Sequence, residues 1–200
     1  DCWTPMIFAS LSVAVALKTG LFNIGVSGQM LAAGFITTIT VGYSTLSAPI
    51  AKPLVILVAA AVGALVGGLI GFLKYRFNIN EVVSSIMLNY IIEYVVGFFI
   101  NTRYVNPISR QSQTVSSEAR LTLSGTKIGD LKFDIPLGII LAVIVVVIVT
   151  YIFDRTALGY ELKAVGSNQK ASRYAGTPVG KNMILTMMIY GLLEGLAGRA

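Results

Sequence analysis

Six long apolar stretches alternate with polar ones along this 200-residue chain. Each stretch is about 18–20 residues long, which is the length that an α-helix needs to cross the hydrocarbon core of a bilayer. The two long polar connections cover 102–135 and 154–182. The pattern predicts an all-α fold, a polytopic transmembrane helical bundle with about six spans, at 5–22, 29–47, 53–73, 82–101, 136–153 and 183–200.

The composition is that of a membrane protein. Hydrophobic residues make up 55% of the chain and charged residues 12%, about half the charged share of a soluble domain. A soluble bundle would show a polar stripe on each surface helix, and these stretches lack one. The single Cys2 excludes a disulfide within the chain, and the absence of histidine removes the commonest metal ligand and general base. We therefore expect no metal site.

Basic residues beside the predicted spans indicate the orientation. One side of the membrane receives eight of them and the other side six. The first group is Lys18, Lys74, Arg76, Arg155, Lys163, Lys170, Arg173 and Lys181, and the second is Lys52, Arg103, Arg110, Arg120, Lys127 and Lys132. We expect 154–182 to be cytoplasmic and 102–135 extracytoplasmic. The net charge of +6 suits anionic lipid headgroups, so no nucleic-acid partner is expected.

Two local patterns concern packing and turns. Gly63, Gly67 and Gly71 recur every four residues on one face of the third predicted span. A face without side chains lets two helix backbones approach closely, which holds helices together in lipid. We assign these glycines to helix packing. In the extracytoplasmic loop, 121–124 and 126–128 flank Gly125 and are predicted to form a small hairpin.

The stretch LFNIGVSGQM at 21–30 interrupts the apolar pattern. Gly25 and Gly28 break the run, and Asn23 and Gln29 add polar groups at or near membrane depth. Non-helical backbone at that depth must be buried in protein or line a water-filled cavity. Broken helices of this kind often mark the substrate route of a transporter. The alternative is an ordinary tight turn at the membrane surface.

Polar residues follow one face of the fourth predicted span. Glu81, Ser85, Asn89 and Glu93 are spaced by four, so they lie along one side of a helix. An ionisable residue within a span normally faces a bundle interior or a water-filled path. We consider Asn23, Gln29, Ser85, Asn89 and Glu93 candidates for a path taken by a polar, uncharged solute. The alternative is that the stripe only joins helices by hydrogen bonds.

Three segments carry a family resemblance. They are GLFNIGVSGQML (20–31), NINEVVSSIMLNYI (78–91) and TALGYELKAVGSNQKASRYAG (156–176). The chain resembles the permease subunits of ATP-binding-cassette importers, in the nucleoside-type branch related to simple-sugar and branched-chain amino acid permeases. Such permeases are longer at both ends. The resemblance therefore implies that 1–200 is a single transmembrane permease domain that lacks terminal spans.

The same resemblance implies a short coupling helix in the 154–182 loop that docks into an ATPase subunit. The residues that it assigns to coupling are Gly159, Gly166, Asn168, Lys170, Ala171, Arg173, Tyr174 and Gly176. The local sequence is compatible with a helix over 168–175. Ser167 or Asn168 can cap its start, and Gly176 followed by Pro178 can end it.

This short helix would have two unlike faces. The apolar face comprises Ala171, Tyr174 and Ala175, while Gln169, Lys170, Ser172 and Arg173 are expected to stay in water. A helix of two turns is too short to be stable alone, so it needs packing from its own domain and from a partner. A plain solvated loop with positive charges is the alternative.

The resemblance implies the subunit of an importer in the bacterial cell membrane that translocates nucleosides by alternating access. Its partners would be a separate ATPase subunit, a second permease chain, an extracytoplasmic solute-binding protein and the lipid bilayer. The sequence has no phosphate-cradling G-x-x-x-x-G-K-[ST] loop, so we expect no cofactor in this chain, no enzyme activity, and ATP bound by the separate subunit.

Other functions remain open on the sequence. Simple sugars or branched-chain amino acids would suit the same importer type. An ion-coupled secondary transporter would need an ion site, for which Glu93 alone is thin evidence. A membrane enzyme would need convergent catalytic groups, yet the acids in or at the spans are only Glu81, Glu93 and Glu194. A purely structural membrane subunit is the last alternative.

Overall fold

The computed structural model describes residues 3–42, 48–104, 122–123, 127–128, 131–132 and 135–198. Helices dominate these residues, which confirms the predicted all-α membrane fold. They are α1 (Trp3–Thr19), α2 (Val26–Thr37), α3 (Ala48–Phe77), α4 (Glu81–Phe99), α5 (Leu137–Arg155), α6 (Ala157–Ser167), α7 (Gln169–Tyr174) and α8 (Val179–Ala197). Two π-helical turns, η1 (Thr38–Gly42) and η2 (Ile100–Tyr104), extend α2 and α4.

Each predicted span coincides with a helix, but the helices are not equally apolar. Within the described residues, three stretches are long and apolar enough to cross a membrane, namely Ala51–Phe77, Glu81–Thr102 and Gly138–Arg155. The apolar helices Trp3–Thr19 and Val26–Val41 are shorter. The helix at the sixth predicted span, α8, carries Lys181, Asn182 and Glu194. Its position in the bundle explains how it tolerates them.

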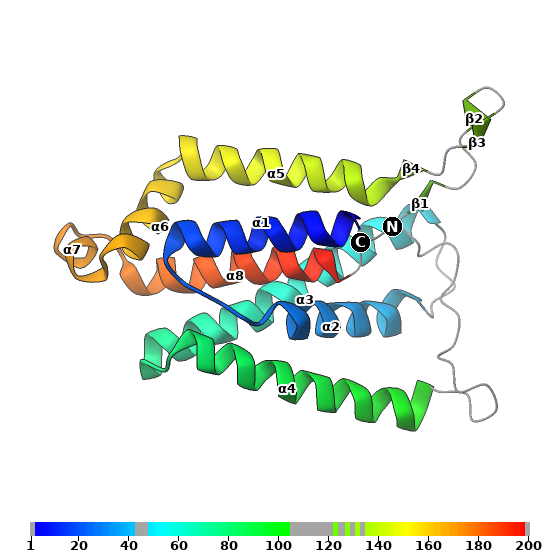
Figure 1. Ribbon diagram of the computed structural model, residues 1–200, viewed down its shortest axis with the longest axis horizontal. Coiled ribbons are helices and arrows are strands. Elements are labelled where there is room, and N and C mark those ends of the chain that lie inside the picture. Colours follow the sequence, from blue (N-terminus) through cyan, green and yellow to red (C-terminus); the bar gives the residue numbers. More distant parts are fainter. Residues whose placement is uncertain are drawn as a thin grey trace.

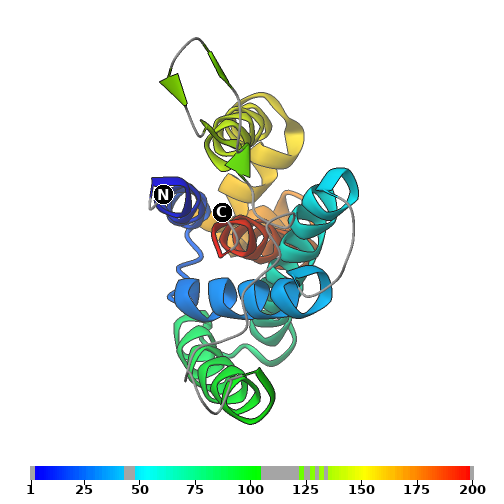
Figure 2. The ribbon, with the colours of Figure 1, turned by 90° about the vertical axis from the view of Figure 1, so that its right-hand side faces the viewer.

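Helix α8 forms the centre of the bundle. It lies between α1 and α3 in Figure 1, and the turned view shows α1, α2 and α3 around it (Figure 2). The side chains of Tyr190, Leu193 and Glu194 are all at most 1% exposed. Because α8 is enclosed by protein, its polar residues are not required to face lipid.

The closest helix contact joins α3 to α8. A Cβ on Gly63 would overlap the carbonyl oxygen of Gly191, and one on Gly67 would overlap that of Met187. Gly195 on α8 in turn faces the backbone of Ala59. The two backbones therefore touch directly, as small-residue faces allow in membranes. The sequence indicated the α3 face but not its partner on α8.

The strands are short and pair differently from the prediction. β1 (Thr122–Leu123) pairs with β4 (Ile135–Pro136), and β2 (Lys127–Ile128) pairs with β3 (Leu131–Lys132), both antiparallel. The predicted hairpin across Gly125 is wrong, because one residue is too short a connection. The observed pairing of Ile128 with Leu131 instead leaves two residues between the strands, the commonest hairpin spacing.

The bundle has two distinct ends. The end of α1, the turn between α3 and α4, and the pair α6 and α7 lie at one end, while the termini and strands lie at the other (Figure 1). At the first end Asp154 accepts a hydrogen bond from Lys163 at 3.0 Å and lies 3.8 Å from Lys18. Lys74 pairs with Glu81 across the α3–α4 turn. The Asp154 contacts thus join α5 to α6 and α1, and the Lys74–Glu81 pair joins α3 to α4.

The glycine contact predicts a contrast between two substitutions. Gly67→Ala places a methyl group on the Met187 carbonyl and should cost about 1–3 kcal/mol by overpacking. Gly97→Ala is the matched control, because a Cβ there meets nothing within 4 Å, and it should gain up to about 1 kcal/mol of helix propensity. Thermal unfolding of both variants in detergent measures the difference. Equal melting temperatures would contradict the direct backbone contact.

Candidate functional site

Residues 20–25 form an extended segment inside the bundle. Helix α1 ends at Thr19 and α2 begins only at Val26. Figure 1 shows the chain running back along the bundle before α2 starts. Leu21 is 2% exposed and Asn23 is 3% exposed. The alternate residues Phe22 and Ile24 are 47% and 42% exposed, so the segment is non-helical backbone with one buried side rather than a tight turn at the surface.

Side chains of α4 and α8 hydrogen-bond this backbone. The Ile24 N–H donates to Ser85 Oγ at 3.2 Å, and Asn89 Nδ2 donates to the Ile24 carbonyl at 3.0 Å. Asn89 Oδ1 also accepts from the Gly28 N–H, in the first turn of α2, at 3.0 Å. The Tyr190 hydroxyl donates to the Asn23 carbonyl at 2.8 Å. These side chains supply the bonds that a helix would have made internally.

The five path candidates fall into two groups. Asn23, Gln29, Ser85 and Asn89 gather around the extended segment, and among them Ser85 and Asn89 spend their hydrogen bonds on its backbone. Glu93, one turn further along α4, is exposed, and its side chain has no partner among the described residues. The polar stripe of α4 thus has one part that bonds to the extended segment and the start of α2, Ser85 and Asn89, and one exposed part, Glu93.

One buried carboxyl group, that of Glu194, does not belong to the site residues predicted from the sequence. Glu194 is 0% exposed, and its Oε1 accepts a hydrogen bond from Ser12 Oγ on α1 at 3.0 Å. One turn earlier on α8 stands Tyr190, whose hydroxyl donates to the Asn23 carbonyl. The available signal was an acid in an otherwise apolar span, which usually marks a buried polar site.

The second site is the tip formed by α6 and α7. Asn168 caps α7, since its Oδ1 accepts from the Lys170 and Ala171 N–H groups, both at 3.0 Å. The helix is followed by Gly176, whose φ of +80° suits glycine. Both features agree with the limits expected from sequence.

The faces of α7 differ in one respect from the expected ones. Ala171, Tyr174 and Ala175 are all exposed, and Tyr174 is 94% exposed. Lys170 and Arg173 are exposed as well. Ser172 is only 5% exposed, so its expected position in water is wrong. It lies nearly opposite Tyr174 on the helix, on the side that packs against the rest of the chain.

Gly159 and Gly166 lie away from the exposed tip. A Cβ on Gly166 would overlap the Thr19 carbonyl oxygen, and one on Gly159 would overlap that of Ile152. Both glycines therefore let α6 pack closely on α1 and α5. They lie in the packing of α6 and not on the exposed surface of α7.

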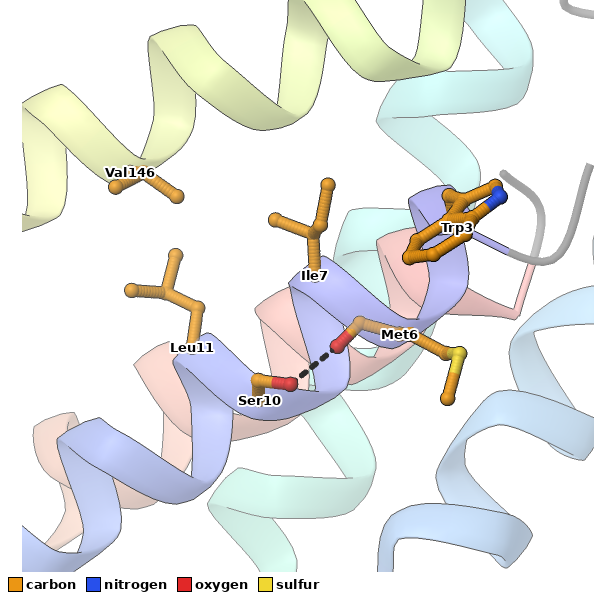
Figure 3. A pocket seen from close by; sticks show the side chains of 6 residues that line it. All are labelled: Trp3, Met6, Ile7, Ser10, Leu11 and Val146. Atoms are coloured by element: carbon orange, nitrogen blue, oxygen red, sulfur yellow. Dashed lines mark hydrogen bonds between the residues drawn. The ribbon is translucent and has the colours of Figure 1, made fainter.

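A groove of about 490 Å³ runs between α1 and α5. Its lining is apolar, and its only hydroxyl, that of Ser10, donates back to the Met6 carbonyl at 2.5 Å (Figure 3). The remaining lining residues are Trp3, Ile7, Leu11 and Val146. The Trp3 indole N–H is the one polar side-chain group of this lining without a partner among the described residues, so the groove is too apolar to be a polar solute site.

Comparison with known proteins gives several relatives along nearly the whole chain. The guanosine ABC transporter permease protein NupP of Bacillus subtilis is 40% identical over 98% of this chain and 56% of its own length. The nucleoside ABC transporter permease protein NupB of Lactococcus lactis is 37% identical, over 97% and 55%. The glucose ABC transporter permease protein TsgB13 of Haloferax volcanii is 30% identical, over 98% and 53%.

The chain thus spans about half the length of the curated relatives that it matches. No solved structure matches it. The family model described as "Branched-chain amino acid transport system / permease component" matches residues 3–200. A match over almost every residue, joined to an all-α membrane bundle, shows that the chain belongs to this family of transport permeases.

Proposed function

We propose that this chain is the membrane-spanning part of an ATP-driven importer that carries nucleosides across the bacterial cell membrane by alternating access. The observation that carries the proposal is the similarity to a guanosine permease and a nucleoside permease, at 40% and 37% identity. The glucose permease is more distant, at 30%. Because the chain covers only part of these relatives, the proposal concerns the complete protein.

The importer would divide its work among several chains. A separate ATPase subunit binds and hydrolyses ATP, so this chain holds no nucleotide and is not an enzyme. An extracytoplasmic binding protein delivers the solute to the side of the 102–135 loop. A second permease chain, identical or related, encloses the path together with this one.

The α7 tip is the proposed contact with the ATPase. Its exposed side chains combine a small apolar face, Ala171 and Ala175, with an aromatic ring, Tyr174, and two cations, Lys170 and Arg173. A six-residue helix needs a partner to be stably ordered. This end of the bundle would face the cytoplasm, in agreement with its basic residues.

Glu93 supports a solute path along α4. It lies inside the apolar stretch Glu81–Thr102 and is exposed on the single chain. Lipid is a poor environment for a carboxyl group at this depth. The α4 face around Glu93 would therefore border water between two permease chains. Ser85 and Asn89 would support the path indirectly by holding the extended segment.

ATP-driven uptake by the complete importer in proteoliposomes tests the solute and the path together. We expect labelled nucleosides to be taken up in preference to sugars and branched-chain amino acids. Glu93→Gln should lower nucleoside uptake or change its preference while the melting temperature stays unchanged. Asn89→Ala should instead destabilise the chain by about 1–3 kcal/mol, because it leaves buried backbone groups unpaired, and should reduce the uptake of all solutes alike.

Three results would contradict parts of the proposal. Uptake of sugars without nucleosides would reassign the solute, and uptake driven by an ion gradient without ATP would contradict the importer class. Wild-type rate and preference in Glu93→Gln would remove Glu93 from the path.

The coupling role of α7 predicts a ranking of two neighbouring variants. Ala171→Glu would bury an unpaired charge in the ATPase contact, at a cost of about 2–5 kcal/mol. That corresponds to a roughly 30- to 4,000-fold loss of docking, since each 1.4 kcal/mol is tenfold. Co-purification of the ATPase and solute-stimulated ATP hydrolysis should both fall, with membrane insertion intact. Lys170→Ala, at the edge of the face, should do much less; the reverse ranking would place the contact on the other side of α7.

A further inference from the structure

The centre of the bundle holds a group of buried polar side chains, and some of their polar atoms have no hydrogen-bond partner among the described residues. Asn23, Gln29, Tyr190 and Glu194 are each at most 3% exposed. They come from the extended segment, α2 and α8. Four of their polar atoms have no partner among the described residues, namely Asn23 Nδ2, Gln29 Nε2, Gln29 Oε1 and Glu194 Oε2.

The side chains lie close together. A Cβ on Gly25 would be 2.6 Å from Asn23 Oδ1 and 2.8 Å from Gln29 Nε2, so both amides border the same point. A Cβ on Gly191 would be 3.0 Å from Gln29 Oε1, which places this amide against α8. The Tyr190 hydroxyl donates to the Asn23 carbonyl, and Tyr190 stands one turn before Glu194 on α8.

The glycines let the backbone approach these amides closely. A Cβ at Gly25 would lie within 3 Å of both amides, and one at Gly191 would meet the Gln29 amide as well as the Gly63 carbonyl. Asn23 Oδ1 accepts from the Gly25 N–H at 2.7 Å. That bond fixes the orientation of the Asn23 amide and leaves its Nδ2 donor without a partner among the described residues.

A buried polar atom without a partner costs about 1–3 kcal/mol, so native structures satisfy such atoms with protein or water. The free atoms here include two amide donors and two oxygen acceptors. A cation would leave both donors unpaired, and an anion would meet the carboxyl group. A molecule that both donates and accepts matches the set, and buried water typically makes about three such bonds.

We propose that Asn23, Gln29 and Glu194 form an internal water-binding site at the junction of α1, the extended segment, α2 and α8. The site lies within one permease chain and is separate from the Glu93 face, which is exposed on α4. It supplies partners to the polar atoms that the bonds of Ser85, Asn89 and Tyr190 leave unpaired. It does not depend on the nature of the transported solute.

X-ray hydroxyl-radical labelling of the purified full-length complex tests the site, because bound water generates radicals beside the residues that it touches. Tyr190 is the reporter at 0% exposure, and Phe153 is the matched buried control at 3% exposure. Phe153 stands near the end of α5, closer to bulk water, which makes the comparison conservative. Each labelling rate is divided by the rate for the same residue in the unfolded chain.

We expect Tyr190 to be labelled several-fold faster than Phe153. Gln29→Met keeps the side-chain length but removes both amide atoms, so it should lower Tyr190 labelling several-fold and leave Phe153 unchanged. Equal, background labelling of Tyr190 and Phe153 in the unsubstituted protein would overturn the site. Fast labelling of Tyr190 that Gln29→Met leaves unaltered would overturn the assignment of Gln29 to it.

Discussion

The backbone of the extended segment 20–25 sets the main constraint on this structure. Polar backbone groups inside a bilayer must be bonded within the protein. Within the described residues this segment makes backbone bonds at its two ends alone, where the Gly20 and Leu21 N–H groups donate to α1 and the Gly25 carbonyl accepts from Gln29. Ser85 and Asn89 of α4 and Tyr190 of α8 supply three of its contacts. The positions of α4 and α8 relative to α2 follow from this requirement, and so does the polar character of helix faces that would otherwise be apolar.

A central helix free of lipid makes the arrangement possible. Helix α8 approaches α3 so closely that the carbonyls of Gly191 and Met187 occupy the positions of missing side chains on Gly63 and Gly67. This packing shields Glu194 and Tyr190 from the membrane. The same helix follows α7 after the short connection at 175–178, so the exposed tip and the buried polar centre are neighbours along the chain.

The sequence was sufficient to predict the helices but not the contacts between them. Spacing by four revealed the α3 glycines and the α4 polar stripe, because each regularity lies within a single helix. Asn168 and Gly176 were recognisable as the limits of α7 from residue type alone. What the sequence left open was always a contact between elements: that Asn89 bonds to Ile24, that Gly191 faces Gly63, and that Ser172 turns inward. Glu194 was visible as an acid but not as a partner of Ser12. The wrong strand pairing has the same origin, since adjacency in sequence was taken for adjacency in the sheet.

Hydrogen exchange of the Ile24 and Gly28 amides, which are bonded to side chains of α4, tests the central claim most directly. In the complete protein, resolved to single residues, the Ile24 and Gly28 N–H groups should exchange as slowly as amides in the middle of α4, since both are bonded to buried or partly buried side chains. The turn at 78–80 is the internal reference, because it is also non-helical but exposed. Exchange at Ile24 and Gly28 as fast as in that turn would contradict the account.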